Sequence, residues 1–157
     1  MQSTYAFHLS PLSRPVYVMA KPAGASCNMR CDYCYYLEKA AKTSLGQDIA
    51  TSRMTDATLE EFIRQYIAIQ TTDSVLFTWH GGEPTLRGLD FYKKVVSLQH
   101  RHAGGKHIDN ALQTNGTLLN EDWCRFLHDE QWLVGISIDG PEDLHNAYRS
   151  LPDRHGN

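Results

Sequence analysis

Short apolar runs alternate with longer segments of helical period along the chain from Pro15 onward. Four of these runs have the length and composition that are typical of β-strands. They are residues 16–20, 74–79, 108–114 and 133–138. Because the runs are short and apolar in character, we expect strands that are buried on both faces of a parallel sheet.

Three segments between the runs have the period of amphipathic helices. The first begins at Thr55 or Asp56, either of which can act as its N-cap. Its apolar stripe consists of Leu59, Phe62, Ile63, Tyr66 and Ile67. The second covers residues 91 to about 102, and the third covers residues 120 to about 130 with Asn120 as N-cap. This alternation predicts about four right-handed βαβ units in sequential order, and so an α/β fold.

The length of the chain, 157 residues, changes this picture. A closed barrel of eight βα units needs roughly 250 residues, so about four units make only about half a barrel. The run at residues 133–138 would also leave an open sheet edge. We therefore expect a fragment of a longer protein, or a partner that supplies the rest. The domain prediction is an N-terminal extension of residues 1–15, followed by one domain of residues 16–157.

Composition and charge exclude several classes of function. Hydrophobic residues make up 41% of the chain and charged residues 21%, as in ordinary globular proteins. A net charge of −3, without alternating basic and aromatic residues, argues against nucleic acid as a partner. The N-terminus has no apolar signal region, and the run at 133–138 is too short to cross a membrane. We predict a cytoplasmic protein with no membrane partner.

Polar, glycine-rich clusters follow the predicted strands. A cysteine loop comes after the first strand, and residues 80–84 follow the second. Residues 113–116 end the third strand, and residues 137–141 end the fourth. Because ligands of parallel α/β folds bind outside the carboxyl ends of the strands, we expect these clusters to line one site.

Three of the four cysteines, Cys27, Cys31 and Cys34, lie within eight residues. A clustered, odd number of thiols in a reducing compartment indicates metal or redox chemistry. A closed zinc site needs four ligands, and a [4Fe–4S] cluster normally has one thiolate on each iron. Three thiolates would leave one iron open for a small chelating ligand. The alternative is a zinc loop completed by a histidine such as His80. We expect the fourth cysteine, Cys124, to pack in the core or against its helix.

Other residues of these clusters have a functional and a structural interpretation. Gly81 and Gly82 lack Cβ atoms, so a ligand can approach their backbone, but they could also form a plain turn. Glu83 could accept a hydrogen bond from an ammonium group or cap the next helix. A strand-end hydroxyl such as that of Ser137 is most often satisfied by backbone. Arg149 carries a fork suited to a carboxylate, although a lone arginine is usually a surface residue.

A few further side chains have mainly structural interpretations. Gln113 and Asn115 could shape the floor of the site, or Asn115 could belong to a simple Asn-Gly turn. Asp139 fits a strand-to-helix turn better than an acid–base role. Trp123 and Trp132 are expected in the core. The histidines expected at the surface are His100, His102, His107 and His128.

The cysteine spacing Cys-x3-Cys-x2-Cys, with Tyr33 before the last cysteine, resembles the signature of radical S-adenosylmethionine enzymes. Four segments narrow the resemblance to the N-terminal half of the anaerobic sulfatase-maturating enzymes and their close enterobacterial homologues. They are MAKPAGASCNMRCDYCYYLEK, FTWHGGEPTLRGLDFY, ALQTNGTLLNEDWCRFL and LVGISIDGPEDLHNAYR. The resemblance runs from about residue 17 to 149. It implies part of a (β/α)6-type open barrel, with a parallel sheet and outer helices.

The resemblance also implies cofactors and their ligands. Cys27, Cys31 and Cys34 would hold a [4Fe–4S] cluster, whose open iron binds the amino and carboxylate groups of S-adenosylmethionine. Family members bind the methionine amino group with the segment that contains Gly81, Gly82 and Glu83, and the contact maps best to Gly82. Other contacts to S-adenosylmethionine map to Ser137 and Arg149, and Tyr33 maps to a backbone contact near the adenine.

The implied reaction begins with one electron from a donor such as flavodoxin or ferredoxin. S-adenosylmethionine is cleaved to methionine and a 5′-deoxyadenosyl radical, which removes hydrogen from a cysteine or serine of a sulfatase, or from another peptide substrate. The sulfatase residue becomes Cα-formylglycine. The family's base and auxiliary clusters lie in a second half, so no catalytic residue is predicted in this chain. His80 replaces the usual glutamine, which leaves the substrate open. The alternatives are a zinc-stabilised interaction module and a degenerate cluster-binding domain.

Overall fold

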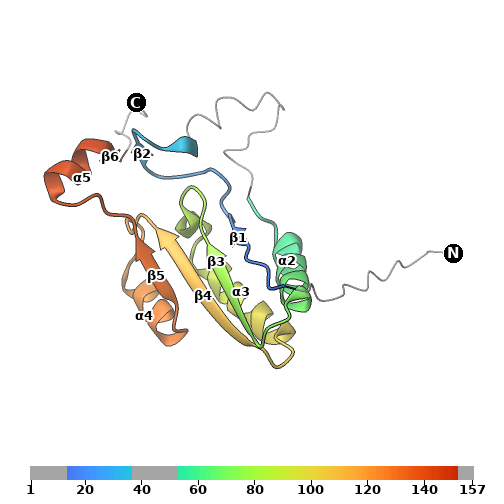
Figure 1. Cartoon of the computed structure of the whole chain (residues 1–157). Coiled ribbons are helices and arrows are strands. Elements are labelled where there is room, and N and C mark those ends of the chain that lie inside the picture. The colour runs from blue at the N-terminus through green and yellow to red at the C-terminus, as the bar shows by residue number, and fades with distance from the viewer. Residues whose placement is uncertain (1–13, 37–52, 152–157) are drawn as a thin grey trace.

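The computed structural model describes residues 14–36 and 53–151, so most of the predicted extension at 1–15 lies outside the described residues. Four parallel strands form the main sheet in the order β1, β3, β4, β5 (Figure 1). They are β1 (Met19–Ala20), β3 (Ser74–Trp79), β4 (His107–Thr114) and β5 (Leu133–Ile136). Between them lie α2 (Asp56–Ile69), η1 (Pro84–Arg87), α3 (Leu89–His102) and α4 (Glu121–Asp129). The parallel, sequential sheet confirms the predicted α/β class and the partial barrel.

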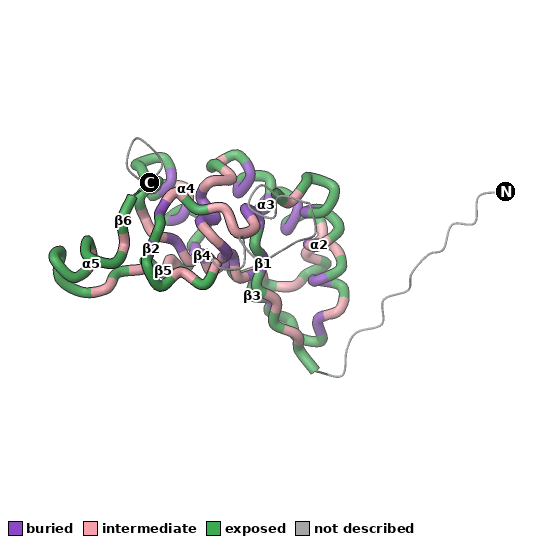
Figure 2. Tube along the Cα trace, turned by 90° about the horizontal axis from the view of Figure 1, so that it is seen from above, coloured by how far each residue is buried: buried purple, intermediate pink, exposed green. Residues whose placement is uncertain are grey.

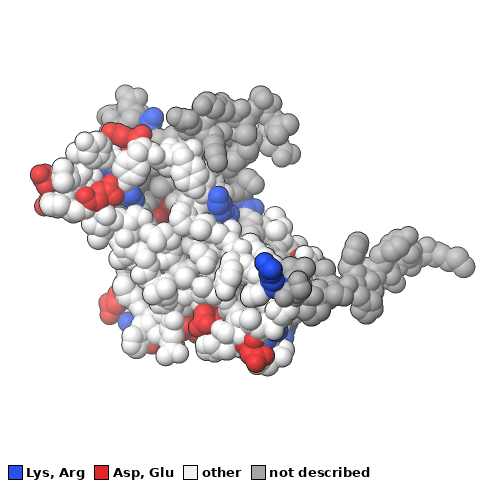
Figure 3. Space-filling view, in the orientation of Figure 1, with Lys and Arg blue, Asp and Glu red and all other residues white. Residues whose placement is uncertain are grey.

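The helices α2, α3 and α4 cover one face of the sheet (Figures 1 and 2). In β3 the residues Val75, Phe77 and Trp79 point to this face and are buried, whereas Leu76 on the other face is 38% exposed. The expectation of strands buried on both faces is therefore wrong for the described residues. The reason is that the other face is the open side of a partial barrel. Figure 3 shows that this side is mainly uncharged.

The core is built around Trp79, which is fully buried. Its ring contacts the rings of Phe62, Phe77, Phe91, Tyr92 and Trp132. The indole nitrogen of Trp79 donates a hydrogen bond to Oδ1 of Asn110, at 2.9 Å. Trp123 and Trp132 are 5% and 7% exposed, which confirms their predicted place in the core.

The first strand is shorter than the predicted run 16–20, because side chains of α2 and of its C-cap residue satisfy the backbone of the first residues of that run. Tyr66 Oη and Gln70 Nε2 donate to the carbonyl oxygen of Val16, at 3.0 and 2.7 Å. The Val18 amide donates to Tyr66 Oη at 3.4 Å. Only Met19 and Ala20 pair with β3. The last strand likewise ends two residues before the predicted position 138.

The helix starts agree with the capping signals. Thr55, and not Asp56, is the N-cap of α2, and its hydroxyl accepts a hydrogen bond from the Thr58 amide at 3.1 Å. Asn120 caps α4 by accepting from the Trp123 amide at 3.0 Å, as predicted. The helix α3 begins two residues before the predicted position 91, directly after Gly88, whose φ of 76° ends η1.

Three further elements were not predicted. The strands β2 (Arg30–Cys31) and β6 (Arg149–Ser150) form an antiparallel pair, and α5 (Glu142–Tyr148) precedes β6. Because β6 pairs with β2, β5 lies at the edge of the described four-stranded sheet, as predicted. None of the residues of α5 is buried, and acidic side chains lie on this helix (Figures 2 and 3). We call residues 27–36 together with 139–151 the cysteine lobe.

Two surface features complete the fold. Cys124 is exposed, so the expectation that it packs in the core is wrong, since it lies outside the buried stripe of α4, which consists of Trp123 and Leu127. His100, His107 and His128 are exposed as predicted, whereas His102 is half-buried. No helix in residues 14–36 and 53–151 is long and apolar enough to cross a bilayer.

Candidate functional site

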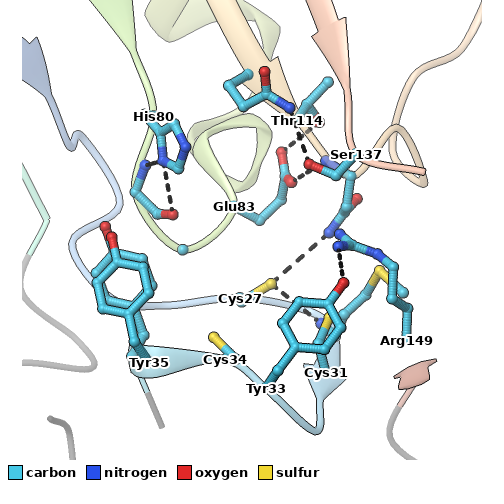
Figure 4. Close-up of a pocket in the computed structure, with 16 residues that line it drawn as sticks. Cys27, Cys31, Tyr33, Cys34, Tyr35, His80, Glu83, Thr114, Ser137 and Arg149 are labelled. Carbon is cyan, nitrogen blue, oxygen red and sulfur yellow. Dashed lines mark hydrogen bonds between the residues drawn. The ribbon is translucent and has the colours of Figure 1, made fainter. Parts of the chain in front are cut away.

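A cavity of about 210 Å³ lies at the carboxyl ends of the strands, between the sheet and the cysteine lobe (Figure 4). Every residue that the sequence singled out for cofactor or metal binding lines it. These residues are Cys27, Cys31, Tyr33, Cys34, Gly81, Gly82, Glu83, Ser137 and Arg149. The structure therefore brings together side chains that are separated by up to 122 positions in the sequence.

Backbone pairing fixes the cysteine loop across the cavity. Cys31 lies in β2 and pairs with Arg149 of β6. The Asp32 amide donates to the carbonyl of Tyr148 at 3.0 Å, and the Cys34 amide donates to the carbonyl of Cys31 at 2.9 Å. In Figure 4 the sulfurs of Cys27 and Cys34 lie between this loop and the strand ends. Backbone hydrogen bonds therefore hold in place the segment that carries the three thiols.

The surroundings of two of the thiols, Cys27 and Cys31, raise their pKa values. Although Cys27 is exposed as a residue, desolvation of its sulfur raises the pKa of its thiol, and hydrogen bonds from the Met29 backbone amide and the Asn115 side-chain amide oppose this. Burial likewise raises the pKa of Cys31, and the charge of Arg149 opposes it. Because metals bind thiolates, ligation at this loop must release protons.

The glycines Gly81 and Gly82 pack against the chain that precedes Cys27. The Gly82 amide donates to the Gly24 carbonyl at 3.0 Å, and the Glu83 amide donates to the Ser26 carbonyl at 2.7 Å. A Cβ on Gly82 would lie 2.1 Å from the Ser26 oxygen. Gly81 has a φ of 124°, which disfavours other residues. Only glycine therefore fits at position 82, because the two loops are in contact there. The sequence alone indicates only the approach of a ligand or a plain turn as a reason for this glycine.

Glu83 joins the loop after β3 to the end of β4. Its side chain caps η1 by accepting from the Thr85 amide at 3.0 Å, so the predicted capping role is confirmed. Its Oε1 also accepts from the hydroxyls of Thr85 and Thr114, at 2.6 and 2.7 Å. Its Oε2 accepts from the Asn115 amide at 2.8 Å. Glu83 is 1% exposed, so its hydrogen bonds join the two loops in a buried position.

Tyr33, Asp139 and Arg149 form a polar cluster within the cysteine lobe. The Tyr33 hydroxyl donates to Asp139, and this bond raises the pKa of Tyr33. Arg149 Nη1 donates to the Tyr33 hydroxyl at 2.8 Å and lies 3.6 Å from the carboxylate of Asp139. The Nε of Arg149 is buried, and no described residue accepts its hydrogen. This donor is available to a ligand in the cavity that Arg149 lines.

Ser137 has a side-chain partner where the sequence argument favoured a backbone one. Gln113 Nε2 donates to the Ser137 hydroxyl at 2.9 Å, so two neighbouring strand ends are joined. Thr114 also lines the cavity but was not singled out from the sequence. The signal that could have found it is its place between Gln113 and Asn115, at the end of β4. Met29 and two tyrosines of the cysteine lobe, Tyr35 and Tyr36, line the cavity and were likewise missed.

The donor set fits a [4Fe–4S] cluster with one iron open to a small ligand. Three thiols line the cavity, and two N–H groups reach the sulfur of Cys27: the Met29 amide at 3.4 Å and Asn115 Nδ2 at 3.8 Å. In a zinc site His80 would be the fourth ligand, but its Nδ1 accepts from the Gly81 amide at 2.6 Å. Among the described residues, no three His, Cys, Asp or Glu side chains are grouped to hold a single metal ion.

Comparisons with known proteins agree with this geometry. The serine-type anaerobic sulfatase-maturating enzyme of Bacteroides thetaiotaomicron is 53% identical over 147 residues, which cover 94% of this chain and 34% of that enzyme. The serine-type enzyme of Klebsiella aerogenes is 43% identical over 145 residues, or 90% of this chain and 33% of that enzyme. The cysteine-type enzyme of Clostridium perfringens is 38% identical over 136 residues, or 86% and 36%. The chain thus spans about a third of these relatives.

Solved structures and a family profile lead to the same group. The structure of anSMEcpe with bound AdoMet and the Cp18Cys peptide superposes with a TM-score of 0.74 at 38% identity, and covers 84% of this chain and 33% of that one. Radical SAM enzymes bind a [4Fe–4S] cluster and S-adenosylmethionine. The profile of the Radical SAM superfamily matches residues 22–155. With this match over most of its length, the chain belongs to the radical SAM superfamily.

Proposed function

We propose that this chain holds a [4Fe–4S] cluster on Cys27, Cys31 and Cys34 and binds S-adenosylmethionine in the adjoining cavity. The observation that carries the proposal is that three thiols share this cavity with the buried Nε of Arg149, which has no hydrogen-bond partner among the described residues. The 53% identity to a serine-type anaerobic sulfatase-maturating enzyme supports it. We also take residues 16–157 as one domain that acts in the cytoplasm, where thiols stay reduced.

The residues of the chain have separate tasks in this proposal. The backbone of Gly82 receives the methionine amino group, and Oε2 of Glu83, which accepts one hydrogen bond in the described structure, has a lone pair for the same ammonium. Arg149 binds the carboxylate through the buried N–H of its Nε. Ser137, oriented by Gln113, contacts S-adenosylmethionine from the end of the sheet. Tyr33 provides a backbone contact near the adenine.

When bound, the cluster and S-adenosylmethionine supply a 5′-deoxyadenosyl radical, after one electron arrives from a donor such as flavodoxin or ferredoxin. The substrate that we propose is a cysteine or serine of a sulfatase, which is oxidised to Cα-formylglycine. Relatives of both the serine and the cysteine type support this substrate class. Because the chain spans about a third of these enzymes, we assign to it cofactor binding and orientation, and no acid–base residue.

Anaerobic reconstitution with iron and sulfide tests the cluster. The wild-type chain should become brown and bind about four irons per chain. The variants Cys27→Ala, Cys31→Ala and Cys34→Ala should lose the iron, whereas Cys124→Ala, which removes an exposed thiol outside the cavity, should retain it. A colourless protein that retains zinc would refute the cluster and favour the interaction module.

Binding of S-adenosylmethionine separates an active domain from a degenerate one. Isothermal titration of the reconstituted chain should show binding that Arg149→Ala weakens by at least tenfold, since the variant lacks the charged fork. The matched control is Arg125→Ala, which removes an exposed arginine of α4. A chain that holds four irons but does not bind S-adenosylmethionine would be a degenerate cluster-binding domain.

A further inference from the structure

We propose that Asn115 tunes the reduction potential of the cluster by donating a hydrogen bond to the sulfur of Cys27, and that Asn28 and Thr117 hold its amide in place. The inference rests on the proposed function, because it takes Cys27 to be a cluster ligand. It assigns a positioning and tuning role to three residues that do not bind the cofactor themselves.

A hydrogen bond and a sharp turn hold the backbone of Asn115 in place. Asn115 follows the last residue of β4, and its amide donates to Oε2 of the buried Glu83 at 2.8 Å. The next residue, Gly116, has a φ of 77°, so the chain turns sharply after Asn115. The side chain therefore leaves the end of β4 from a defined position and reaches across the cavity edge to the cysteine loop.

Hydrogen bonds then determine which end of the Asn115 amide faces the sulfur. Its Oδ1 accepts from the backbone amide of Thr117 at 3.0 Å and from the Thr117 hydroxyl at 2.8 Å. Two donors on one atom identify it as the oxygen, because an NH₂ group cannot accept. The nitrogen Nδ2 must then face the cysteine loop.

A closed ring of three side chains holds this orientation. Asn115 Nδ2 donates to Oδ1 of Asn28 at 2.9 Å, and Asn28 Nδ2 donates to the Thr117 hydroxyl at 2.7 Å. The single hydroxyl proton of Thr117 is used on Asn115, so the hydroxyl oxygen is free to accept from Asn28. Each member thus fixes the donor and acceptor roles of the other two. The ring ties the loop after β4 to the residue that follows Cys27.

The second amide proton of Asn115 is the one directed to the cluster ligand. An NH₂ group has two protons, and the bond to Asn28 uses one of them. Asn115 Nδ2 also lies 3.8 Å from Cys27 Sγ, at a length suited to a hydrogen bond to sulfur. The Met29 amide donates to the same sulfur at 3.4 Å. Cys27 therefore receives one donor from its own loop and one from the end of the sheet.

Hydrogen bonds to ligand sulfurs are one of the means by which proteins set the potential of iron–sulfur clusters. A reduced cluster carries more negative charge on its sulfurs, so an N–H donor stabilises the reduced form more than the oxidised form. Loss of the Asn115 donor should therefore shift the potential to a more negative value. The cluster would become harder to reduce, although its ligands are unchanged.

Redox titration of the reconstituted chain without S-adenosylmethionine, followed by the electron paramagnetic resonance signal of the reduced cluster, tests the proposal. Asn115→Asp is nearly isosteric and keeps the acceptor for Thr117 and the backbone bond to Glu83, but it replaces the donor by a negative charge. It should give the largest negative shift. Asn115→Ala, which removes the donor without adding a charge, should give a smaller shift in the same direction.

A matched pair of variants at Thr117 and a control variant at Asn146 make the test specific. Thr117→Val removes the hydroxyl that orients Asn115 and should shift the potential in the same direction, whereas Thr117→Ser keeps the hydroxyl and should leave it unchanged. Thr117 is exposed, so both variants should fold. Asn146→Ala removes an exposed asparagine of α5 and should match the wild type.

The outcomes distinguish this inference from the proposed function. If the wild-type chain takes up no cluster, the proposed function fails and the inference fails with it. If all variants bind about four irons and their potentials equal that of the wild type, the inference alone is overturned. If the Asn115 variants do not load, the Thr117 pair decides: equal potentials for valine and serine overturn the proposal, and a negative shift for valine alone supports it.

Discussion

The helix-covered sheet and the cysteine lobe are held together by different forces. In the sheet, Leu59, Ile63 and Trp79 are fully buried, and aromatic rings fill the space beneath the helices. In the cysteine lobe, α5 has no buried residue, and polar side chains such as Tyr33 and Asp139 make the contacts. Figure 2 shows the contrast, with buried positions in the sheet layer and exposed ones along α5.

This difference indicates that the two regions contribute unequally to the free energy of unfolding. Truncation of a buried aromatic residue costs about 3–5 kcal/mol, whereas a typical hydrogen bond contributes about 0.5–1.5 kcal/mol. The cysteine lobe should therefore open locally at a much lower free energy than the sheet unfolds. A site that must admit a cofactor is thus built where a rigid layer meets a loosely held one.

The largest expected effect is in the sheet. Trp79→Ala should lower the free energy of unfolding by about 4 kcal/mol, because it removes the ring at the centre of the aromatic core and leaves Asn110 without its indole donor. Urea unfolding followed by circular dichroism measures this. Trp79→Phe, which keeps an aromatic ring, should lose less. A loss of unfolding free energy below about 1 kcal/mol for Trp79→Ala would contradict the view that buried aromatic packing dominates the stability of the sheet.

The next effect is at the boundary between the two regions. Glu83→Ala should cost about 3 kcal/mol, because it removes a buried, charged acceptor and leaves the Thr114 hydroxyl and the Asn115 amide unpaired. The same unfolding experiment measures it, and hydrogen exchange at the Asn115 amide should accelerate. Glu142→Ala, an exposed glutamate on α5, is the control and should change neither quantity.

A smaller effect is expected where a polar contact belongs to the sheet layer. Thr55→Ala removes the N-cap of α2 and should cost about 1 kcal/mol, whereas Thr55→Ser retains the hydroxyl and should cost less. Chemical unfolding of both variants measures the difference. Equal stability of alanine and serine at this position would show that the cap does not contribute.

The smallest global effect is expected in the cysteine lobe. Tyr33→Phe removes the hydroxyl that joins Asp139 to Arg149, yet the free energy of unfolding should change by less than about 0.5 kcal/mol, because this region opens before the sheet unfolds. Hydrogen exchange at the Asp32 amide, which pairs with Tyr148, should become faster. The control is Tyr17→Phe, since Tyr17 is 79% exposed. A loss of unfolding free energy as large as that expected for Thr55→Ala would show that the cysteine lobe does not open separately from the sheet.

The sheet layer could be predicted from the sequence because its signals are local. Asn120 precedes an amphipathic stretch and caps it, and α2 follows from Thr55 in the same way. The exception is instructive: residues 16–18 have the composition of a strand, but Tyr66 and Gln70 satisfy the backbone from about 50 positions away. No local pattern contains that information.

Much of the membership of the candidate site was predictable, although Met29, Tyr35, Tyr36 and Thr114 were missed, but its geometry was not. Convergence of strand ends indicated that the cysteines and the loop of Gly82 would meet, and they line one cavity. The pairing of Tyr33 with Asp139, 106 positions apart, had no signal in the sequence. Neither had the ring of Asn115 with Asn28 and Thr117, because side-chain hydrogen bonds depend on positions that only the folded backbone defines.

The close packing of Gly82 on the main chain of Ser26 has a consequence for protein engineering. The 2.1 Å approach involves a carbonyl oxygen, so no change of rotamer could make room for a methyl group. The two segments must therefore be exchanged together if pieces of this chain are recombined with those of a relative. A chimera that joins the cysteine loop of one parent to the glycine loop of another inherits an unmatched surface, whereas a crossover placed within α3, which follows both segments, leaves the pair intact.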